Sequence, residues 1–429
     1  MNESNPQRFD RTITLLFRTY CLYLILYFLF ISDFALNYRV LWHVNAPLKY
    51  LSDSLGLFLF KAFFNPSFKE IRFWDSYWTY SKLLAFLVIA LILASIWTFA
   101  DKAKGARKLF VYMHAFSRYY LFIAMLLYGL WKIFGNQLVI SPHQFFQPMD
   151  FYQPQIVIWT AMAASKSYPI FGGIMEVVAS LLFLFRRTTT LGALIALSLL
   201  VNILVLDMGF DTPVKVFAIH LLLFNFLILW PDIIKLFRFF ILGQSATLSS
   251  IPPVIGNKKF QGLGYVSKAL VIGIAIIPQL ITNMSWNFEA NHTPYRELIG
   301  IHEIDTSYRT MSGISTKVYN PKSWIKFSIE EGGWFYALFP GGHVSNYHLE
   351  ADTLKKIIKI TSWDSSFNGK LHYRNIDSAN WLFEGTDGRD SLRFITRQID
   401  IYKHPLFKDY GRIIWSWSLS APPNSAHIQ

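Results

Sequence analysis

Cysteine is nearly absent from this chain of 429 residues, because Cys21 is the only one. A single thiol excludes an internal disulfide, a Cys-x-x-Cys redox pair and a c-type haem attachment. The sequence also contains no HExxH, P-loop, GxGxxG or GxSxG pattern, so the common zinc-protease, nucleotide-binding and hydrolase motifs are missing. Any domain of this chain outside the cytoplasm is therefore expected to be stable through its own core.

Charge is scarce as well, since 16% of the residues are charged and 53% are hydrophobic. The apolar residues form blocks of roughly 18 to 24 residues, the length that a helix needs to cross hydrocarbon. The first block, 13–31, is longer than the apolar core of a signal peptide and is expected to be retained. The sequence predicts an all-α membrane domain of seven transmembrane helices, near 12–31, 76–99, 108–134, 170–186, 189–208, 213–230 and 265–283.

The basic excess belongs to the membrane half. Residues 1–282 hold 24 Lys and Arg against 12 Asp and Glu, whereas residues 283–429 hold 16 against 15. This pattern argues against nucleic acid as a partner, because the bases lie in short connections between apolar blocks. Every second connection is rich in Lys and Arg, which predicts a multi-pass cell-membrane protein with a cytoplasmic N-terminus and an extracytoplasmic C-terminal domain.

Two shorter apolar stretches are expected to lie on the membrane surface rather than to cross it. Leu51–Phe64 is too short to span and carries Lys61. Ile233–Leu242 places Lys235 and Arg238 on one face of a helix. Both patterns are typical of interfacial amphipathic helices.

The pattern changes after Met284, which divides the chain into a transmembrane domain, 1–283, and a β-rich (α+β) domain, 284–429. Short alternating runs at 324–329, 335–339, 370–374 and 392–399 predict an antiparallel sheet, with turns at 332–333, 341–342, 368–369 and 387–388. One helix is expected within 347–360, with Asp352 and Thr353 near its start. The spacing of His343, His348 and Glu350 fits no established metal-ligand pattern. Tyr410, Trp415 and Trp417 are interpreted as core or membrane-interface contacts.

Ionisable side chains inside a membrane are costly and tend to face the protein interior or a water-filled cavity. Six are expected in the apolar blocks, and five of them lie in the outer half of the predicted bundle, Arg118 being deeper: Arg118, Lys132, Glu176, Asp207, Lys215 and His220.

Helical spacing brings two of these residues together in the prediction. Glu176 shares a face with Gly172, Ala179 and Ser180, while Lys132 shares a face with Arg118. A Lys132–Glu176 ion pair is sterically reasonable, either as a structural link between two helices or as part of a functional site. For Asp211 and Lys215 an i,i+4 pair at a helix start is the favoured interpretation. A buried, hydrogen-bonded histidine is favoured over a ligand-binding one for His220.

The segment from Arg118 contains Gly129-x-x-Lys132, and the next block begins Phe171-Gly172-Gly173 and continues to Glu176 before closing on Arg186 and Arg187. These features resemble the DoxX-type membrane family over residues 108–230. That family includes subunits described as thiosulfate:quinone oxidoreductase. The chain is also similar, more distantly, to the membrane half of the vitamin K-dependent carboxylase group, whose members carry an extracytoplasmic β domain. Lys132 and Glu176 are the positions that match.

The resemblance implies a membrane redox protein or subunit that binds a quinone-like or lipid-like ligand in an outer-leaflet pocket. Lys132 would supply charge or a proton to a ligand oxygen, and Glu176 would hold Lys132 or relay the proton. Arg118, Asp207 and His220 would line the pocket. The alternative is a non-catalytic scaffold or assembly factor whose exported domain binds an envelope protein. A transporter is disfavoured, because no inverted repeat or broken helix pair is evident.

Overall fold

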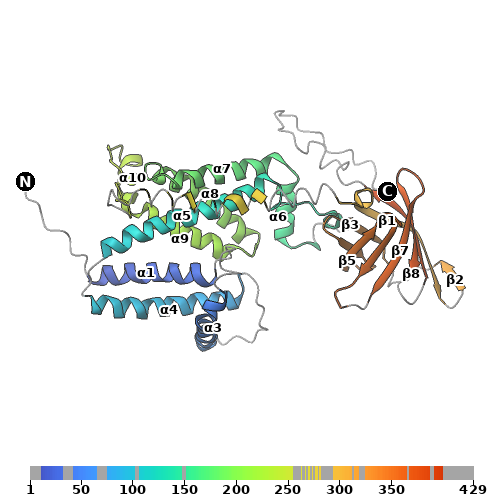
Figure 1. The fold of residues 1–429 in the computed structure, drawn as a ribbon, viewed down its shortest axis with the longest axis horizontal. Coiled ribbons are helices and arrows are strands. Elements are labelled where there is room, and N and C mark those ends of the chain that lie inside the picture. The colour runs from blue at the N-terminus through green and yellow to red at the C-terminus, as the bar shows by residue number, and fades with distance from the viewer. Residues whose placement is uncertain are drawn as a thin grey trace, which may run out of the picture. The chain divides into compact units, whose positions relative to one another are not determined.

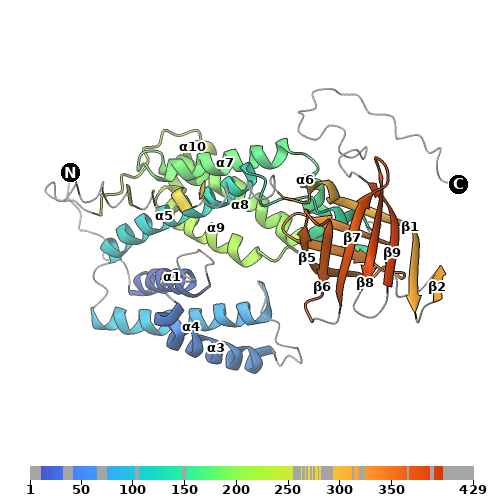
Figure 2. The ribbon, with the colours of Figure 1, turned by 45° about the vertical axis from the view of Figure 1, so that its right-hand side comes forward.

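The protein was analysed as a computed structural model, shown in Figure 1 and, turned by 45°, in Figure 2. It describes residues 11–31, 42–64, 75–101, 106–146, 151–254, 293–311, 314–317, 324–364, 367–386 and 391–399, together with scattered positions between 262 and 281. The chain forms two compact units. The first contains residues 1–130 and 174–279, and the second contains residues 131–173 and 280–429.

Long helices make up the first unit, and most of them coincide with the expected apolar blocks. Their bounds are α1 (Arg11–Phe30), α3 (Trp42–Phe64), α4 (Tyr77–Ala100), α5 (Ala106–Ile133), α7 (Ser167–Phe183), α8 (Thr189–Gly209), α9 (Lys215–Leu229) and α10 (Ile233–Phe240). Five helical spans among the described residues are long and apolar enough to cross a membrane, or six if the bent pair of α7 and the preceding short helix is one span. These helices indicate that the α-helical part of the protein lies in a membrane.

The core of the first unit lies where α1, α5, α7 and α9 meet. Leu24, Leu121, Phe122, Phe183 and Phe224 are all at most 1% exposed there. Many of the exposed residues on the outer faces of these helices are also apolar, as expected for helices whose outer surface contacts lipid. Apolar residues on every side thus distinguish these helices from those of a soluble bundle.

Helix α3 is longer than the expected interfacial stretch and begins at Trp42. Figure 1 shows it almost end-on, whereas α1 and α4 run across the view, so α3 is steeply inclined to its neighbours. It approaches α4 closely at Gly56, where an added Cβ would lie 2.7 Å from the carbonyl oxygen of Ser81. The expected helix at 233–242 is found as α10.

A short 3-10 helix, η1 (Pro142–Phe145), and helix α6 (Pro154–Ala163) belong to the second unit. The expected two-domain division assigned this segment to the membrane domain and did not predict α6. Its apolar residues form a small core with the outer face of the sheet, made of Ile140, Phe146, Ala163, Ile301 and Leu338.

The β-rich C-terminal domain is an eight-stranded antiparallel barrel with one additional strand. The strands are β1 (Gly300–Met311), β2 (Ile314–Lys317), β3 (Lys326–Glu330), β4 (Trp334–Leu338), β5 (Val344–Asp352), β6 (Ile357–Thr361), β7 (Asn368–Asn375), β8 (Asn380–Thr386) and β9 (Ser391–Ile399). Sequential neighbours pair from β3 to β9, and β1 pairs with both β3 and β9, which closes the ring. Strand β2 extends the far end of β1 as a hairpin.

Strand β1 pairs with two neighbouring strands because it is long and contains an irregularity in its register. Its first residues pair with β3, and its pairing with β9 shifts register between Ile304 and Thr306. Such a bulge bends a strand and increases its twist, which helps a sheet to close. Between β3 and β4, Gly332 and Gly333 both have positive φ angles, 75° and 78°, which a glycine adopts without strain.

Aromatic and branched side chains fill the barrel interior. Phe327, Phe335 and Phe383 are at most 1% exposed, and the Phe327 and Phe335 rings stack with centroids 4.9 Å apart. The alternation of buried and exposed residues along β7 and β9 explains why these strands could be predicted from the sequence.

The prediction of a helix within 347–360 is wrong. That segment is β5, a turn and β6, and the Asp352 carboxylate accepts a hydrogen bond from the backbone N–H of Lys355, 3.0 Å away. The seventh helix, 265–283, is helical at its described positions but lies largely outside the described residues. Residues 387–388, Tyr410, Trp415 and Trp417 also lie outside the described residues.

Candidate functional site

Glu176 and Lys132 occupy different units. Glu176 lies on α7 in the first unit and is 3% exposed, on the buried face that includes Ala179 and Ser180. Lys132 lies in the last turn of α5, in the second unit. This helix ends in a Schellman motif, because the N–H of Gly135 donates to Lys132 and the N–H of Asn136 donates to Trp131. The inward orientation of Glu176 is confirmed, while the ion pair stays a prediction.

Arg118 caps the end of a neighbouring helix. Its Nε and Nη2 atoms donate to the carbonyl oxygen of Phe183, the last residue of α7, at 3.0 and 2.6 Å. The side chain is 5% exposed. A guanidinium at a helix C-terminus satisfies a carbonyl that has no partner within its helix and complements the helix dipole. This geometry gives Arg118 a structural role between α5 and α7.

His220 is buried and hydrogen-bonded, as the favoured interpretation expected. Its Nδ1 lies 2.6 Å from the carbonyl oxygen of Val216, which can only accept, so Nδ1 carries the proton. In the neutral ring, Nε2 then accepts from the hydroxyl of Tyr23 at 2.9 Å. The ring also stacks on Tyr27 with centroids 3.6 Å apart. His220 thus joins α9 to α1.

Asp207 lies near the end of α8 and is 6% exposed. Its carboxylate accepts a hydrogen bond from the hydroxyl of Thr212, and its carbonyl accepts from the N–H of the same residue at 3.0 Å. Asp207 therefore organises the turn between α8 and α9. The Lys215–Asp211 pair follows directly after it, with Nζ and Oδ1 2.6 Å apart, as the sequence predicted.

The sequence interpretation missed the best-defined ion pairs of the first unit. Arg18 on α1 is fully buried and binds both carboxylate oxygens of Asp101 at 2.9 and 2.6 Å. Lys82 on α4, 1% exposed, lies 2.8 Å from Asp53 on α3. Asp75 accepts hydrogen bonds from the first N–H groups of α9. Their signal was the presence of charges inside or beside apolar blocks, as for Glu176.

A polar contact anchors η1 to the barrel in the second unit. Oε1 of Glu330 on β3 accepts three hydrogen bonds of 2.9 Å, from the N–H and Nδ1 of His143 and from the hydroxyl of Ser328. The imidazole stacks on Tyr336, with centroids 3.8 Å apart. Burial, with Glu330 nearby, raises the pKa of the Tyr336 phenol. This cluster of residues is called the η1 clamp below.

An aromatic patch faces solvent beside the η1 clamp. Trp334 and Trp363 are 38% and 69% exposed, and their ring centroids are 5.9 Å apart. The Trp334 ring also stacks with the Tyr336 ring, with centroids 6.3 Å apart. Exposed tryptophans are unusual on protein surfaces and are enriched where proteins bind one another.

No family model and no solved structure matches the chain. A stretch of 76 residues is 34% identical to "Uncharacterized protein YwoB" of Bacillus subtilis, strain 168. This stretch is 18% of the chain and 49% of that protein, so the chain spans about half the length of the curated relative that it matches. None of these comparisons links the chain to the DoxX-type family or the carboxylase group, and that resemblance stays a prediction.

Proposed function

We propose that the chain crosses the membrane seven times, with a cytoplasmic N-terminus and an extracytoplasmic barrel. Ile140, Phe146 and Ala163 pack against the barrel within one unit, which supports placing both on the same side of the membrane. An even number of crossings must therefore separate them. In this proposal α7 crosses without α6, and α8 and α9 cross as well. Residues 262–281, helical where described, are the fourth crossing.

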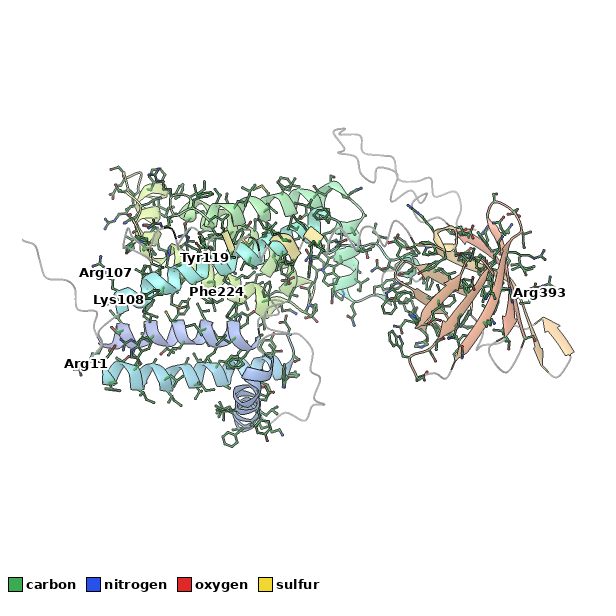
Figure 3. All side chains as sticks on the ribbon, viewed as in Figure 1. Arg11, Arg107, Lys108, Tyr119, Phe224 and Arg393 are labelled. Atoms are coloured by element: carbon green, nitrogen blue, oxygen red, sulfur yellow. The ribbon has the colours of Figure 1, made fainter. Side chains whose placement is uncertain are left out.

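The same parity fits the preceding helices. Three candidate spans, α1, α4 and α5, precede η1, and three crossings would put the N-terminus on the side opposite the barrel. The basic residues agree with this arrangement. Figure 3 labels Arg11, Arg107 and Lys108 at one end of the helices of the first unit, and α10 with its Lys235 and Arg238 lies at that end in Figure 1. A cluster of bases at one end of a bundle is typical of its cytoplasmic side.

The protein would then function as a non-catalytic scaffold or assembly factor that presents the barrel to an envelope protein. The observation that carries this proposal is that Arg118, His220 and Asp207 are each hydrogen-bonded to neighbouring groups of the protein itself. Groups held in this way contribute to helix packing, which accounts for their burial without a bound cofactor. The exposed pair of Trp334 and Trp363 supplies a surface that fits an extracytoplasmic protein partner.

Labelling of single cysteines tests the topology. In a Cys21→Ser background, Leu354→Cys introduces a thiol at a barrel position that is 97% exposed, and Lys108→Cys introduces one at an exposed position of α5. A membrane-impermeant maleimide should label Leu354→Cys in intact cells and Lys108→Cys only after the cells are opened. The reverse pattern would reject the seven-span arrangement.

Photocrosslinking tests the scaffold function. A photoreactive phenylalanine derivative at Trp334 or Trp363 should give one recurrent adduct with an envelope protein, whereas the same group at Leu354 should not. Leu354 is the matched control because it is exposed and apolar but lies outside the aromatic patch. A quinone or chromophore bound stoichiometrically to the purified chain, without any adduct, would instead support the redox hypothesis.

A further inference from the structure

A cavity of about 390 Å³ lies in the first unit, where the turn between α7 and α8 meets the junction of α9 and α10 and residues 248–251. Its polar lining includes Arg186 and Arg187 from the turn, His114 from α5 and Ser250. The two arginines are exposed, whereas His114 is 5% exposed. The cavity therefore combines a basic rim with a buried imidazole.

The one carboxylate of the lining is already neutralised by its neighbours. Asp232 is 2% exposed and accepts hydrogen bonds from the N–H of Ser249 at 2.7 Å and the hydroxyl of Thr190 at 3.2 Å. Lys235 lies 3.4 Å from its Oδ1. The positive charge of the arginine pair is thus left uncompensated within the cavity.

Donors that face the cavity retain capacity for a ligand. Among the described residues no carboxylate pairs with Arg186 or Arg187. Nη1 of Arg186 donates a long hydrogen bond of 3.4 Å to the carbonyl oxygen of Ile251. The imidazole of His114, although buried, has no hydrogen bond to a described residue. A buried polar side chain without such a partner is uncommon, and a ligand in the cavity would supply one.

We propose that this cavity binds the phosphate of an anionic phospholipid headgroup. Paired arginines match phosphate oxygens in charge and geometry. Basic pockets between transmembrane helices on the cytoplasmic side are suited to such headgroups. The surface beside the cavity is apolar: Trp230, next to the lining Pro231, is 61% exposed, and the lining Leu248 is 46% exposed. Acyl chains would pack there while the phosphate enters the cavity.

The test uses the full chain, purified in detergent and titrated with phosphatidylglycerol or phosphatidylcholine while native mass spectrometry counts bound lipid. Phosphatidylglycerol should bind at one site at least tenfold more tightly than phosphatidylcholine. The double variant Arg186→Gln with Arg187→Gln should lose that preference. The control Arg107→Gln with Lys108→Gln removes two exposed bases from the same end of the bundle, outside the cavity lining, and should keep it.

Three results would overturn the proposal. Equal loss in both double variants would mean general surface attraction, and equal affinity of the wild-type protein for the two lipids would remove the site altogether. Competition by inorganic phosphate at comparable concentration would assign the cavity to a free anion rather than to a lipid. His114→Leu gives a second measure, because it should weaken phosphatidylglycerol binding without changing any fixed charge of the rim.

Discussion

The imidazole Nδ1 of His143 lies 2.9 Å from Oε1 of Glu330, a residue 187 positions later in the chain. This hydrogen bond joins the segment before α7 to strand β3, so two parts of the sequence separated by the helices α7, α8 and α9 form one folded unit. The proposed topology depends on this unit, because its two parts would lie on the same side of the membrane.

Replacing the glutamate of the η1 clamp should destabilise the second unit. Glu330 is 7% exposed and accepts three hydrogen bonds, and each bond to a charged group contributes about 1.5–3 kcal/mol. We expect Glu330→Gln to lower the free energy of unfolding by about 3 kcal/mol, measured by urea denaturation of the full chain. Glu350→Gln, which removes an exposed partner of His348, should change it by less than about 1 kcal/mol. Equal effects would show that the clamp is not a stabilising contact.

The stability of the barrel should fall at acidic pH because of His302. Burial lowers the pKa of this histidine to about 4, and its Nε2–H donates to the carbonyl of Leu298. An unfolded histidine titrates near about 6.5, so the unfolded chain binds more protons between these values and stability is lost as the pH falls through them. We expect a loss of about 3 kcal/mol from pH 7 to pH 4, from this group alone. His302→Gln should flatten that dependence in pH-dependent denaturation, and His348→Gln, an exposed control, should not.

The buried Arg18 should require its carboxylate partner. Asp101→Asn leaves a guanidinium with no exposed surface unpaired with its anion, which typically costs about 3–5 kcal/mol. We therefore expect strongly reduced accumulation of Asp101→Asn in membranes, measured by immunoblot. Combining it with Arg18→Met should restore part of the accumulation. The Lys215–Asp211 pair is the control because the aspartate side chain is 85% exposed, and Asp211→Asn should accumulate normally.

Lys132 and Glu176 remain predicted partners, and a double variant tests the pair. Glu176→Gln and Lys132→Met, each alone, should impair accumulation or function, because either change leaves one charge without its expected partner. If the pair is structural, the double variant recovers both properties. If it is chemical, accumulation recovers while function stays lost. Wild-type behaviour of both single variants would contradict any role for the pair.

Much of the fold follows from local patterns. The apolar blocks predict α1, α4, α5, α7, α8 and α9, because a span must hide its backbone over a fixed length of hydrocarbon. Alternation predicts β7 and β9 because each strand has one face in the barrel core. The helix predicted around Asp352 was wrong because aspartate favours both helix starts and turns. Only the tertiary structure selects between these two conformations.

The candidate site was harder to predict, because the partners of its charges are distant in sequence. A lone Lys82 in an apolar block gives no indication that Asp53 on α3 lies 2.8 Å away. Likewise, Arg118 looks like a functional charge until the end of α7 is seen beside it. Helix α6 was missed because ten residues starting at Pro154 are too few to be recognised as a span.

The closure of the barrel has a consequence for its biogenesis. Ile301 near the start of β1 pairs with Ile399 at the end of β9, so the ring cannot be completed until the whole domain has left the ribosome. Contacts between such distant residues slow folding, and the waiting strands expose unpaired edges that can aggregate. The segment around η1 is synthesised much earlier than β3. We therefore expect loss of the His143 contact with Glu330 to lower the yield of folded barrel as well as its stability.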